Sequence, residues 1–333
     1  MQRIGVIGAG AWGTALAVAA RRAGRDVVFW ARNPDLAERL NTLHENADYL
    51  PGVALDAAIQ ATGDLATAAQ CDALLLVVPA QHIRWIGGAL APLVPQGPAG
   101  PPLVICAKGI EQGSGALMGE VLEAVLPGRR VAVLSGPTFA AEVGRGLPTA
   151  VTLAAQDEAL ATSLVAALGS ATFRPYSSGD PLGAQLGGAL KNVIAIACGI
   201  VSGRALGDNA RAALITRGLA EIMRLGVATG ARRETLMGLS GLGDLTLTCT
   251  GNLSRNYTLG RALGEGQSLE AIMRGRRSVA EGVFSASAAV QLAARHGVEM
   301  PIAQAVDGIL NRDAVIEDVI QGLLARPFTA ETT

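Results

Sequence analysis

The chain has 333 residues, of which 50% are hydrophobic and only 17% are charged, and its formal net charge is −1. This composition excludes a disordered chain, which needs few apolar and many charged residues. The near-neutral charge also excludes the broad basic face that nucleic-acid binding needs. A chain of this length can form one large core or, more often, two domains.

Up to about residue 180, short β-rich runs alternate with Ala-rich helical stretches. The predicted strands are residues 3–8, 27–30, 73–78, 103–107, 131–135 and 149–154. Continuous apolar strands are typical of a parallel sheet covered on both faces, and strands separated by helices predict a doubly wound α/β domain. The Pro- and Gly-rich residues 95–102 are predicted as a surface loop. We therefore predict a Rossmann-like, dinucleotide-binding domain over residues 1–180.

A glycine motif follows the first predicted strand directly. Residues 8–13 read GAGAWG and open a helix predicted over residues 14–22. Glycines at Gly8, Gly10 and Gly13 allow a tight turn, close approach of the backbone to a pyrophosphate and close helix–strand packing. In this strand–turn–helix context the motif predicts a dinucleotide site.

The second predicted strand ends in WARN, residues 30–33. An enzyme that prefers NAD would place Asp or Glu here, on the ribose, whereas an Arg suits a 2′-phosphate. Arg32 therefore predicts that NADP(H) is accepted. The alternative is that Arg32 is solvated and that Asp35 turns inward.

Beyond about residue 180 the strand signals stop, and helical patterns cover roughly residues 181–202, 207–229, 281–296 and 301–323. We predict an all-helical domain over residues 181–333. The longest strongly apolar stretch, residues 193–203, is well short of the ~18 to 20 residues that a bilayer demands, so no integral membrane segment is predicted.

The N-terminal residues show no signal-peptide pattern. Four cysteines, Cys71, Cys106, Cys198 and Cys249, are scattered without a CxxC pair or a nearby His cluster. We therefore predict that the four cysteines are small buried apolar residues of a protein in a reducing, cytoplasmic compartment. We predict neither a disulfide framework nor a metal site. The three histidines, His44, His82 and His296, show no triad or ligand pattern.

Of the 27 cations, 25 are Arg and two are Lys, Lys108 and Lys191. Arg is effectively never deprotonated, whereas the pKa of Lys shifts when it is buried, so both lysines are candidates for chemistry, against the alternative of chance survival. Lys108 follows a predicted strand, at the edge where open α/β sheets bind ligands. Lys191 lies in an almost wholly apolar helix, where desolvation would lower its pKa toward the range useful for proton transfer.

Two polar clusters are candidates to converge on Lys191. Asp244 is the sole acid in the apolar residues 241–250, GLGDLTLTCT. Residues 254–256, SRN, gather a hydroxyl, an Arg fork and an amide, as for a phosphate. Spacing leaves open the alternatives that Asp244 is a helix N-cap and that residues 254–256 form a solvated turn.

Seven motifs occur in order between about residue 4 and about residue 323. They are GAGAWGTAL at 8–16, KGIE at 108–111, LSGPTFA at 134–140, ALKNVIAIA at 189–197, GLGDLTLTCT at 241–250, SRN at 254–256 and VAEG at 279–282. With these motifs the chain resembles the bacterial-type NAD(P)-dependent glycerol-3-phosphate dehydrogenases. The resemblance implies a cytoplasmic homodimer that reduces dihydroxyacetone phosphate to sn-glycerol 3-phosphate with NADPH or NADH and so supplies phospholipid synthesis.

The resemblance also assigns residues. It makes Lys191 the general acid/base, with Asp244 beside it in the catalytic set. The substrate contacts it implies are Lys108, Gly136, Thr138, Lys191, Asp244, Ser254, Arg255 and Asn256, with Asn192 near them. The cofactor contacts it implies, besides the three motif glycines, are Ala11, Trp12, Arg32, Tyr49, Lys108, Ala140, Arg255, Val279 and Glu281. Position 11 is commonly Ser in the family, so Ala11 loses a hydroxyl contact to the pyrophosphate and keeps the backbone N–H.

Two other function classes stay open at this point. A β-hydroxyacid or 6-phosphogluconate-type dehydrogenase shares the two-domain plan and a helix-borne Lys, but its Asn follows that Lys a few residues on, whereas Asn192 is adjacent to Lys191. A non-catalytic NADPH-sensing or interaction protein would bind the cofactor without any need for the two lysines, Asp244 and Arg255 together.

Overall fold

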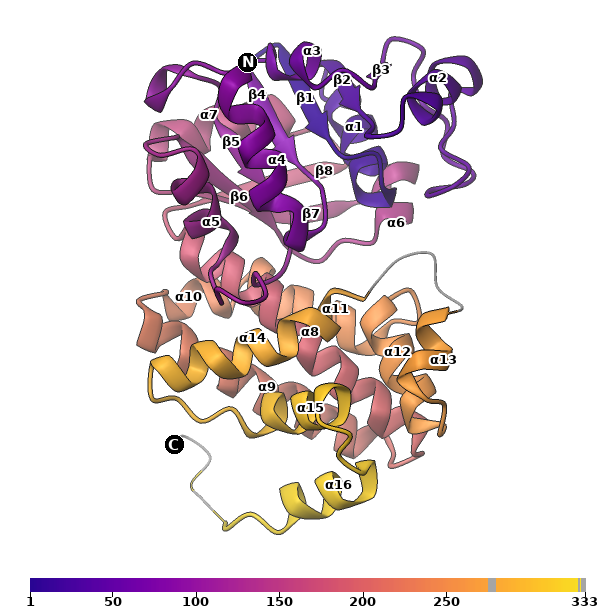
Figure 1. Cartoon of the computed structure of the whole chain (residues 1–333), viewed down its shortest axis with the longest axis vertical. Helices are drawn as coiled ribbons and strands as arrows, with labels where there is room; N and C mark the ends of the chain where they lie inside the picture. The colour runs from indigo at the N-terminus through magenta and orange to yellow at the C-terminus, as the bar shows by residue number, and fades with distance from the viewer. Residues whose placement is uncertain (275–279, 329, 331–333) are drawn as a thin grey trace.

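The computed structural model describes residues 1–274, 280–328 and 330. All strands in this part of the chain lie before residue 179, and every element from Pro181 on is helical. Figure 1 shows the two regions one above the other, the sheet region in indigo to magenta and the helical region in pink to yellow. The all-helical second half agrees with the sequence prediction.

The described strands form one eight-stranded sheet in the order β3-β2-β1-β4-β5-β6-β7-β8. Their bounds are β1 (Arg3–Ile7), β2 (Asp26–Trp30), β3 (Gln60–Thr62), β4 (Ala73–Leu76), β5 (Leu103–Ile105), β6 (Val131–Ser135), β7 (Thr149–Ala155) and β8 (Phe173–Ser178). Strands β1 to β6 are parallel. The chain winds outward from β1 to β3 and then returns to β4 on the other side of β1, which confirms the predicted Rossmann-like, doubly wound sheet.

The sheet departs from the sequence prediction at its edges. Strand β7 runs antiparallel to β6, where a parallel strand was expected. The helix between them packs against the first helix instead of crossing back along the sheet, so β7 begins at the edge where β6 ends. The sequence prediction also missed β3, which has three residues, and β8, whose FRPYSS sequence is only partly buried. Edge strands need no continuous apolar run.

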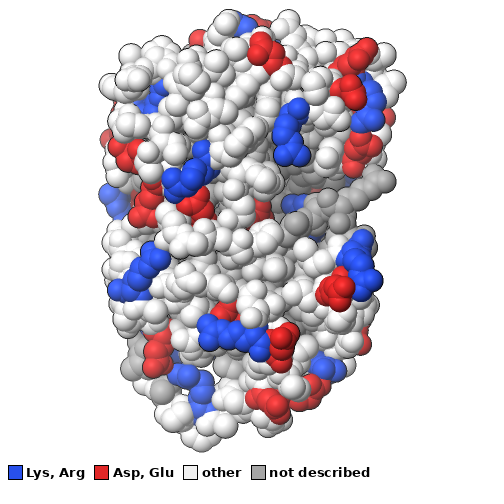
Figure 2. All heavy atoms as spheres, in the orientation of Figure 1, with Lys and Arg blue, Asp and Glu red and all other residues white. Residues whose placement is uncertain are grey.

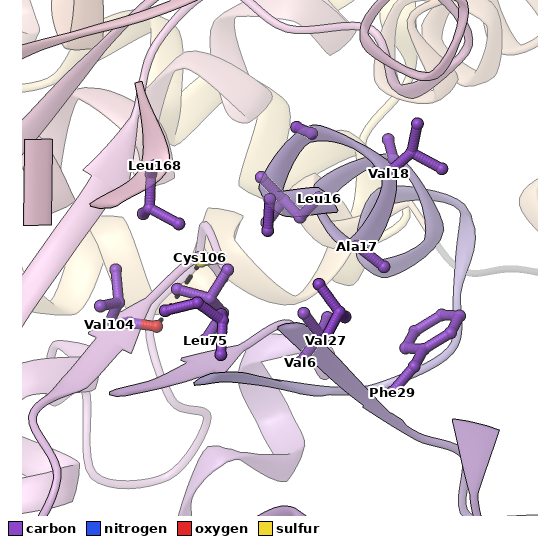
Figure 3. Close-up of a cluster of buried hydrophobic side chains, with 14 of the residues drawn as sticks. Val6, Leu16, Ala17, Val18, Val27, Phe29, Leu75, Val104, Cys106 and Leu168 are labelled. Carbon is purple, nitrogen blue, oxygen red and sulfur yellow. Dashed lines mark hydrogen bonds between the residues drawn. The ribbon is translucent and has the colours of Figure 1, made fainter. Parts of the chain in front are cut away.

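Helices cover both faces of the sheet. Those of the first half are α1 (Ala11–Arg22), α2 (Pro34–Leu43), α3 (Leu65–Ala69), α4 (Ile83–Leu90), α5 (Met118–Val125), α6 (Ala140–Arg145) and α7 (Glu158–Leu168), with short 3-10 turns η1 (Ala80–His82), η2 (Ala91–Leu93) and η3 (Gly97–Ala99). On one face Leu75 packs with Leu16 and Phe29 (Figure 3). Its neighbours Leu74 and Leu76 belong to the core on the opposite face. Burial on both faces explains why this strand is continuously apolar.

The second half is a helical bundle. Its elements are α8 (Pro181–Gly203), α9 (Asp208–Thr229), α10 (Arg233–Leu236), the π-helical turn η4 (Leu239–Gly243), α11 (Asp244–Thr250), α12 (Arg255–Gly264), α13 (Leu269–Arg274), α14 (Glu281–Arg295), α15 (Pro301–Asn311) and α16 (Ile316–Leu324). The single helix predicted over residues 301–323 is wrong. Asp313 adopts a left-handed conformation with φ of 52°, which separates α15 from α16.

Helix α8 runs through the middle of this bundle. The side chain of Asp180 caps its start, accepting a hydrogen bond from the backbone N–H of Gly183 at 2.8 Å. Within the described residues α8 is the one helix long and apolar enough to cross a membrane, but most of it is buried inside the protein, as in the core helix of a globular bundle. All four cysteines are buried and carry free thiols, which confirms their predicted burial.

Four glycines set the close packing of α8 against α12. A Cβ on Gly199 would lie 2.1 Å from the carbonyl oxygen of Tyr257, and a Cβ on Gly260 would lie 2.0 Å from the carbonyl oxygen of Ile196. One helical turn further on, Gly203 and Gly264 approach backbone oxygens of the facing helix in the same way. Because no side chain fits in this seam, the start of α12 has a fixed position relative to the middle of α8.

We expect Gly260→Ala to lower the free energy of unfolding by ~1–3 kcal/mol, the usual cost of overpacking a tight contact. The added methyl group would meet the carbonyl of Ile196, so the two helices would have to separate. Urea denaturation measures the change. Gly322→Ala in α16 is the control, because nothing lies within 4 Å of a Cβ there. Equal stability of the two variants would contradict the seam's role.

Candidate active site

The site lies where the carboxyl ends of the parallel strands face the helical half. Lys108 follows β5 and Gly136 follows β6, so both lie at this edge of the sheet. Helix α8 packs against β6 from the other side, and Figure 1 shows it below that edge. The two halves of the chain therefore meet over the crevice in which doubly wound sheets bind their ligands.

One buried carboxylate holds both lysines. The side chain of Asp244 is fully buried, and its Oδ1 accepts a hydrogen bond from Lys191 Nζ at 2.5 Å while its Oδ2 accepts one from Lys108 Nζ at 2.6 Å. Lys108 Nζ also donates to the carbonyl oxygen of Gly136 at 2.9 Å. The structure thus brings together the three charged residues that the sequence singled out from three separate motifs.

The backbone around Asp244 explains where its side chain points. Asp244 is the first residue of α11, and Gly243 occupies the N-cap position. The N-cap alternative for Asp244 is therefore wrong, and its carboxylate turns to the lysines instead. Two glycines of α8 permit this approach, since a Cβ on Gly187 would lie 2.5 Å from the carbonyl oxygen of Ser240 and a Cβ on Gly188 would lie 2.8 Å from Ser135 Oγ.

The surroundings of Lys191 lower the pKa of its ammonium group to about 8. Burial is the largest cause, because it disfavours the charged form, and the positive charge of Lys108 adds to it. The negative charge of Asp244 opposes both effects. A lysine with this pKa exchanges its proton within the physiological pH range.

Sequence reasoning assigned no role to Thr248, yet its hydroxyl accepts a hydrogen bond from Lys191 Nζ at 2.8 Å. The same hydroxyl donates to the backbone oxygen of Asp244 at 2.6 Å. Asp244 and Thr248 are four residues apart on one helix, so they share a face. That spacing is visible in the sequence and was the signal available for Thr248.

A chain of side-chain amides joins four segments at the site. The backbone N–H of Gly282 donates to Asn256 Oδ1 at 3.0 Å, and Asn256 Nδ2 donates to Asn192 Oδ1 at 2.9 Å. Asn192 Nδ2 then donates to the backbone oxygen of Lys108 at 3.4 Å. These hydrogen bonds connect α14, α12 and α8 to Lys108, in the segment that follows β5.

The alternative of a solvated turn over residues 254–256 is wrong for two of its residues. Ser254 and Asn256 are buried, and Ser254 Oγ caps α12 by accepting a hydrogen bond from the N–H of Tyr257 at 3.2 Å. Arg255 between them is exposed. The start of α12 thus presents a guanidinium on a firmly held turn. Across the crevice, Thr138 Oγ1 donates to the carbonyl oxygen of Gly136 at 3.2 Å.

The glycine loop has the shape that a pyrophosphate needs. Gly8 has φ of 122°, and a Cβ on Gly13 would lie 1.8 Å from the oxygen of Gly8. Helix α1 begins at Ala11, three residues earlier than predicted, with Gly10 at the N-cap position and no side-chain cap. Its first N–H groups are therefore available to an anion. The indole nitrogen of Trp12 is buried and has no partner among the described residues.

The remaining candidate cofactor residues surround this loop. Arg32 is exposed just beyond β2, whose Trp30 carbonyl accepts a hydrogen bond from the N–H of Gly8 at 3.1 Å. Ala140 is the first residue of α6, which packs on α1, and Tyr49 is half exposed. Val279 lies outside the described residues.

Glu281 reaches the cofactor side from the helical half. It is the first residue of α14, and its Oε1 accepts a hydrogen bond from the N–H of Ala80 at 3.3 Å, just after β4. Burial raises the pKa of this carboxyl. Its Oε2 is buried and has no partner in the described part of the chain. A bound dinucleotide would fit here. It could accept hydrogen bonds from the N–H groups of the glycine loop and from the indole N–H of Trp12, and it could contact Glu281 Oε2, which has no partner among the described residues.

Comparisons with known proteins show a similarity that covers both halves of the chain. Residues 3–161 match the family model described as NAD-dependent glycerol-3-phosphate dehydrogenase N-terminus, and residues 180–321 match the model of the C-terminus. A relative from Parvibaculum lavamentivorans, named glycerol-3-phosphate dehydrogenase (NAD(P)+), is 60% identical over 99% of this chain and 98% of its own. A relative of the same name from Rhodospirillum rubrum is 60% identical over 99% of this chain and 94% of its own. The crystal structure of glycerol-3-phosphate dehydrogenase from Coxiella burnetii is 38% identical, covers 98% of this chain and 99% of its own, and has a TM-score of 0.92.

We expect Asp244→Asn to lower the pKa of Lys191 further below its value of about 8, because the variant removes the negative charge that opposes burial. Since the chain has only two lysines, an NMR titration of protein carrying ¹³C-labelled lysine resolves both side chains. Asp307→Asn is the control, a buried aspartate on α15 that pairs with Arg312. An unchanged Lys191 titration in Asp244→Asn would contradict the assigned cause.

Proposed function

The chain belongs to the NAD-dependent glycerol-3-phosphate dehydrogenase family, and from this premise we propose that Lys191 is its proton donor. The enzyme reduces dihydroxyacetone phosphate to glycerol 3-phosphate with a nicotinamide cofactor, a product that enters phospholipid metabolism. The observation that supports this role is the environment of the Lys191 ammonium group. The group is buried and hydrogen-bonded to Asp244, and its pKa is lowered to about 8.

We assign the two halves separate tasks in this proposal. Residues 1–180 hold the dinucleotide, with Gly8, Gly10, Ala11, Trp12 and Gly13 at the diphosphate. Arg32, Tyr49 and Ala140 contact the rest of the cofactor from the sheet domain, and Glu281 reaches it from the other half. When bound, the cofactor supplies the hydride that reduces the ketone carbon. Residues 181–333 bring the proton donor and the substrate contacts.

In the proton transfer, Lys191 Nζ donates to the oxygen of the ketone as negative charge develops there. Asp244 keeps the ammonium charged and aimed until it acts, and Thr248 fixes its direction through the second hydrogen bond. Lys108 adds a second positive charge beside the same oxygen. Preorganised charges of this kind stabilise a transition state because they need no rearrangement during the reaction.

The substrate phosphate binds at the start of α12 in this proposal. The guanidinium of Arg255 offers a fork of donors that matches phosphate oxygens. Ser254 and Asn256 flank it on a buried turn, and Gly136 and Thr138, in the segment that follows β6, complete the site. In this proposal the bound phosphate directs the carbonyl of the three-carbon substrate toward the two lysines.

The surface fits a small-molecule enzyme. Figure 2 shows acidic and basic side chains interspersed over one face, with no broad basic area. We propose that the enzyme acts in the cytoplasm as a homodimer, as the family resemblance implies. Turnover of NADPH with dihydroxyacetone phosphate, followed at the nicotinamide absorbance band, tests the activity. Oxidation of a β-hydroxyacid with NADP+, without turnover of dihydroxyacetone phosphate, would favour the rival dehydrogenase class.

We expect Lys191→Arg to lower kcat by ~10²–10⁴, because Arg keeps the charge and does not release its proton. In the native enzyme, kcat/KM for reduction should fall as pH rises through about 8, since Lys191 then loses the proton that it must donate. The oxidation of glycerol 3-phosphate should show the opposite trend. Arg130→Lys, remote from the site, serves as the control. A near-normal kcat in Lys191→Arg would disprove the proton-donor role.

We expect Arg32→Asp to reduce kcat/KM for NADPH relative to NADH by about tenfold or more, because a carboxylate repels a 2′-phosphate and accepts from a ribose hydroxyl. Steady-state kinetics with both cofactors measures the ratio. Arg39→Asp on α2 makes the same change of charge at an exposed ion pair with Asp48 and is the matched control. If the ratio stays unchanged in Arg32→Asp, Arg32 does not read the 2′-phosphate.

A further inference from the structure

Asn46 is a buried polar residue that the site described above does not include. It lies in the connection between α2 and β3 and is only 1% exposed. Its side chain reaches into the glycine loop, which is far from it in sequence. A buried amide costs free energy unless it is hydrogen-bonded, so its partners indicate its purpose.

The amide nitrogen of Asn46 donates two hydrogen bonds. One goes to the carbonyl oxygen of Ala9 at 3.0 Å, and the other goes to Thr14 Oγ1 at 2.7 Å. The hydroxyl of Thr14 in turn donates to the carbonyl oxygen of Gly10 at 2.9 Å. A carbonyl oxygen can only accept, so the nitrogen of Asn46 has to face Ala9. The hydroxyl of Thr14 uses its one hydrogen on Gly10 and can therefore only accept from Asn46.

These contacts orient the two peptide groups at the tip of the glycine loop. In a planar trans peptide the C=O and the following N–H point in opposite directions. Holding the carbonyls of Ala9 and Gly10 on the side of Asn46 and Thr14 therefore turns the N–H groups of Gly10 and Ala11 to the other side. That is the side from which a diphosphate approaches the start of α1.

Asn46 also organises the segment that carries Tyr49. Its backbone oxygen accepts hydrogen bonds from the N–H of Tyr49 at 3.2 Å and from the N–H of Leu50 at 2.8 Å. Leu50 in turn lies against Gly144 of α6. One residue thus supports both the glycine loop and a neighbouring turn on the cofactor side.

We propose that Asn46 is a positioning residue for the diphosphate of the dinucleotide, acting through Ala9 and Thr14. The inference rests on the proposed function in one respect, that NADPH is the dinucleotide. Without the Asn46 amide, the carbonyl of Ala9 loses its donor, so the N–H of Gly10 is no longer held in the orientation that phosphate oxygens need. The carbonyl of Gly10 keeps the N–H of Thr14 at 2.9 Å, but the Thr14 hydroxyl that also holds it loses its hydrogen bond from Asn46.

Direct binding of NADPH, followed by its fluorescence on titration with full-length enzyme, tests the proposal. Asn46→Ala and Thr14→Val should each raise the Kd for NADPH roughly tenfold to a hundredfold, since each removes a buried hydrogen bond. Asn46→Asp should raise it more than Asn46→Ala, because a carboxylate oxygen would then face the carbonyl oxygen of Ala9. Thr14→Ser keeps the hydroxyl and should restore binding to within about threefold of native.

Kinetics separates positioning from a general loss of structure. At saturating NADPH, kcat and the KM for dihydroxyacetone phosphate should remain close to native in Asn46→Ala. The double variant Asn46→Ala/Thr14→Val should bind NADPH about as well as Asn46→Ala alone, because the two side chains act as one chain of hydrogen bonds.

Asn41→Ala is the matched control. Asn41 donates to the carbonyl oxygen of Ala61 at 2.9 Å and accepts from its N–H at 2.8 Å, so it ties backbone in the same domain without touching the glycine loop. Asn41→Ala should lower the Tm and leave the Kd for NADPH unchanged. The proposal is overturned if Asn46→Ala leaves the Kd for NADPH unchanged. It is also overturned if the rise in Kd comes with a comparable fall in kcat at saturating NADPH and a large fall in Tm.

Two further outcomes are decided by the same set of variants. Should Asn46→Ala fail to fold, the comparison of Thr14→Val with Thr14→Ser decides between the outcomes, since equal Kd values for those two would overturn the proposal. Tight NADPH binding without turnover of dihydroxyacetone phosphate would count against the proposed function and leave the binding comparison valid.

Discussion

The buried carboxylate of Asp244 sets the requirement that the rest of the site meets. A charge removed from water is strongly unfavourable unless partners compensate it, and two lysines from different halves of the chain do so here. Their contacts can form only if α8, α11 and the end of β5 come within hydrogen-bond distance. The glycines of α8 at positions 187 and 188 permit this approach, because a Cβ at either position would clash with the carbonyl of Ser240 or with the side chain of Ser135. The tight helical packing is therefore a condition of the charge cluster.

The same geometry explains why this Arg-rich chain has lysine at these two places. An ammonium is a compact charge with three donors, whereas a guanidinium is a planar fork with five. Lys108 fits between Asp244 and the carbonyl of Gly136, and its stem lies 3.3 Å from where a Cβ on Gly188 would be. Such close backbone leaves little room for a guanidinium. At Lys191 a chemical difference is added, because lysine with a pKa of about 8 can release its proton near neutral pH, whereas arginine cannot.

The sequence predicted those features that leave a local mark. Continuous apolar strands, the glycine loop and the lone Lys191 in an apolar helix all follow from residue type and spacing. Strands β3 and β8 leave no such mark, because they are short or partly exposed at the sheet edges. The break at Asp313 depends on one backbone angle. Asn46 and the Asn192–Asn256 pair were out of reach for another reason: their partners are distant in sequence, and several are backbone atoms that every residue shares.

The net charge of the cluster formed by Lys108, Lys191 and Asp244 also affects which state of the reaction it stabilises. With both lysines protonated, two ammonium groups surround one carboxylate, so the site carries one net positive charge in a largely water-free place. In the proposed mechanism this excess positive charge stabilises the oxyanion as it forms. In the proposed mechanism Lys191 then gives up its proton, so that Lys108 and Asp244 balance each other and the neutral alcohol that results needs no counter-charge. If Lys191 is the proton donor as proposed, the cluster binds the transition state more strongly than the alcohol group of the product, which is the condition for catalysis rather than for tight product binding.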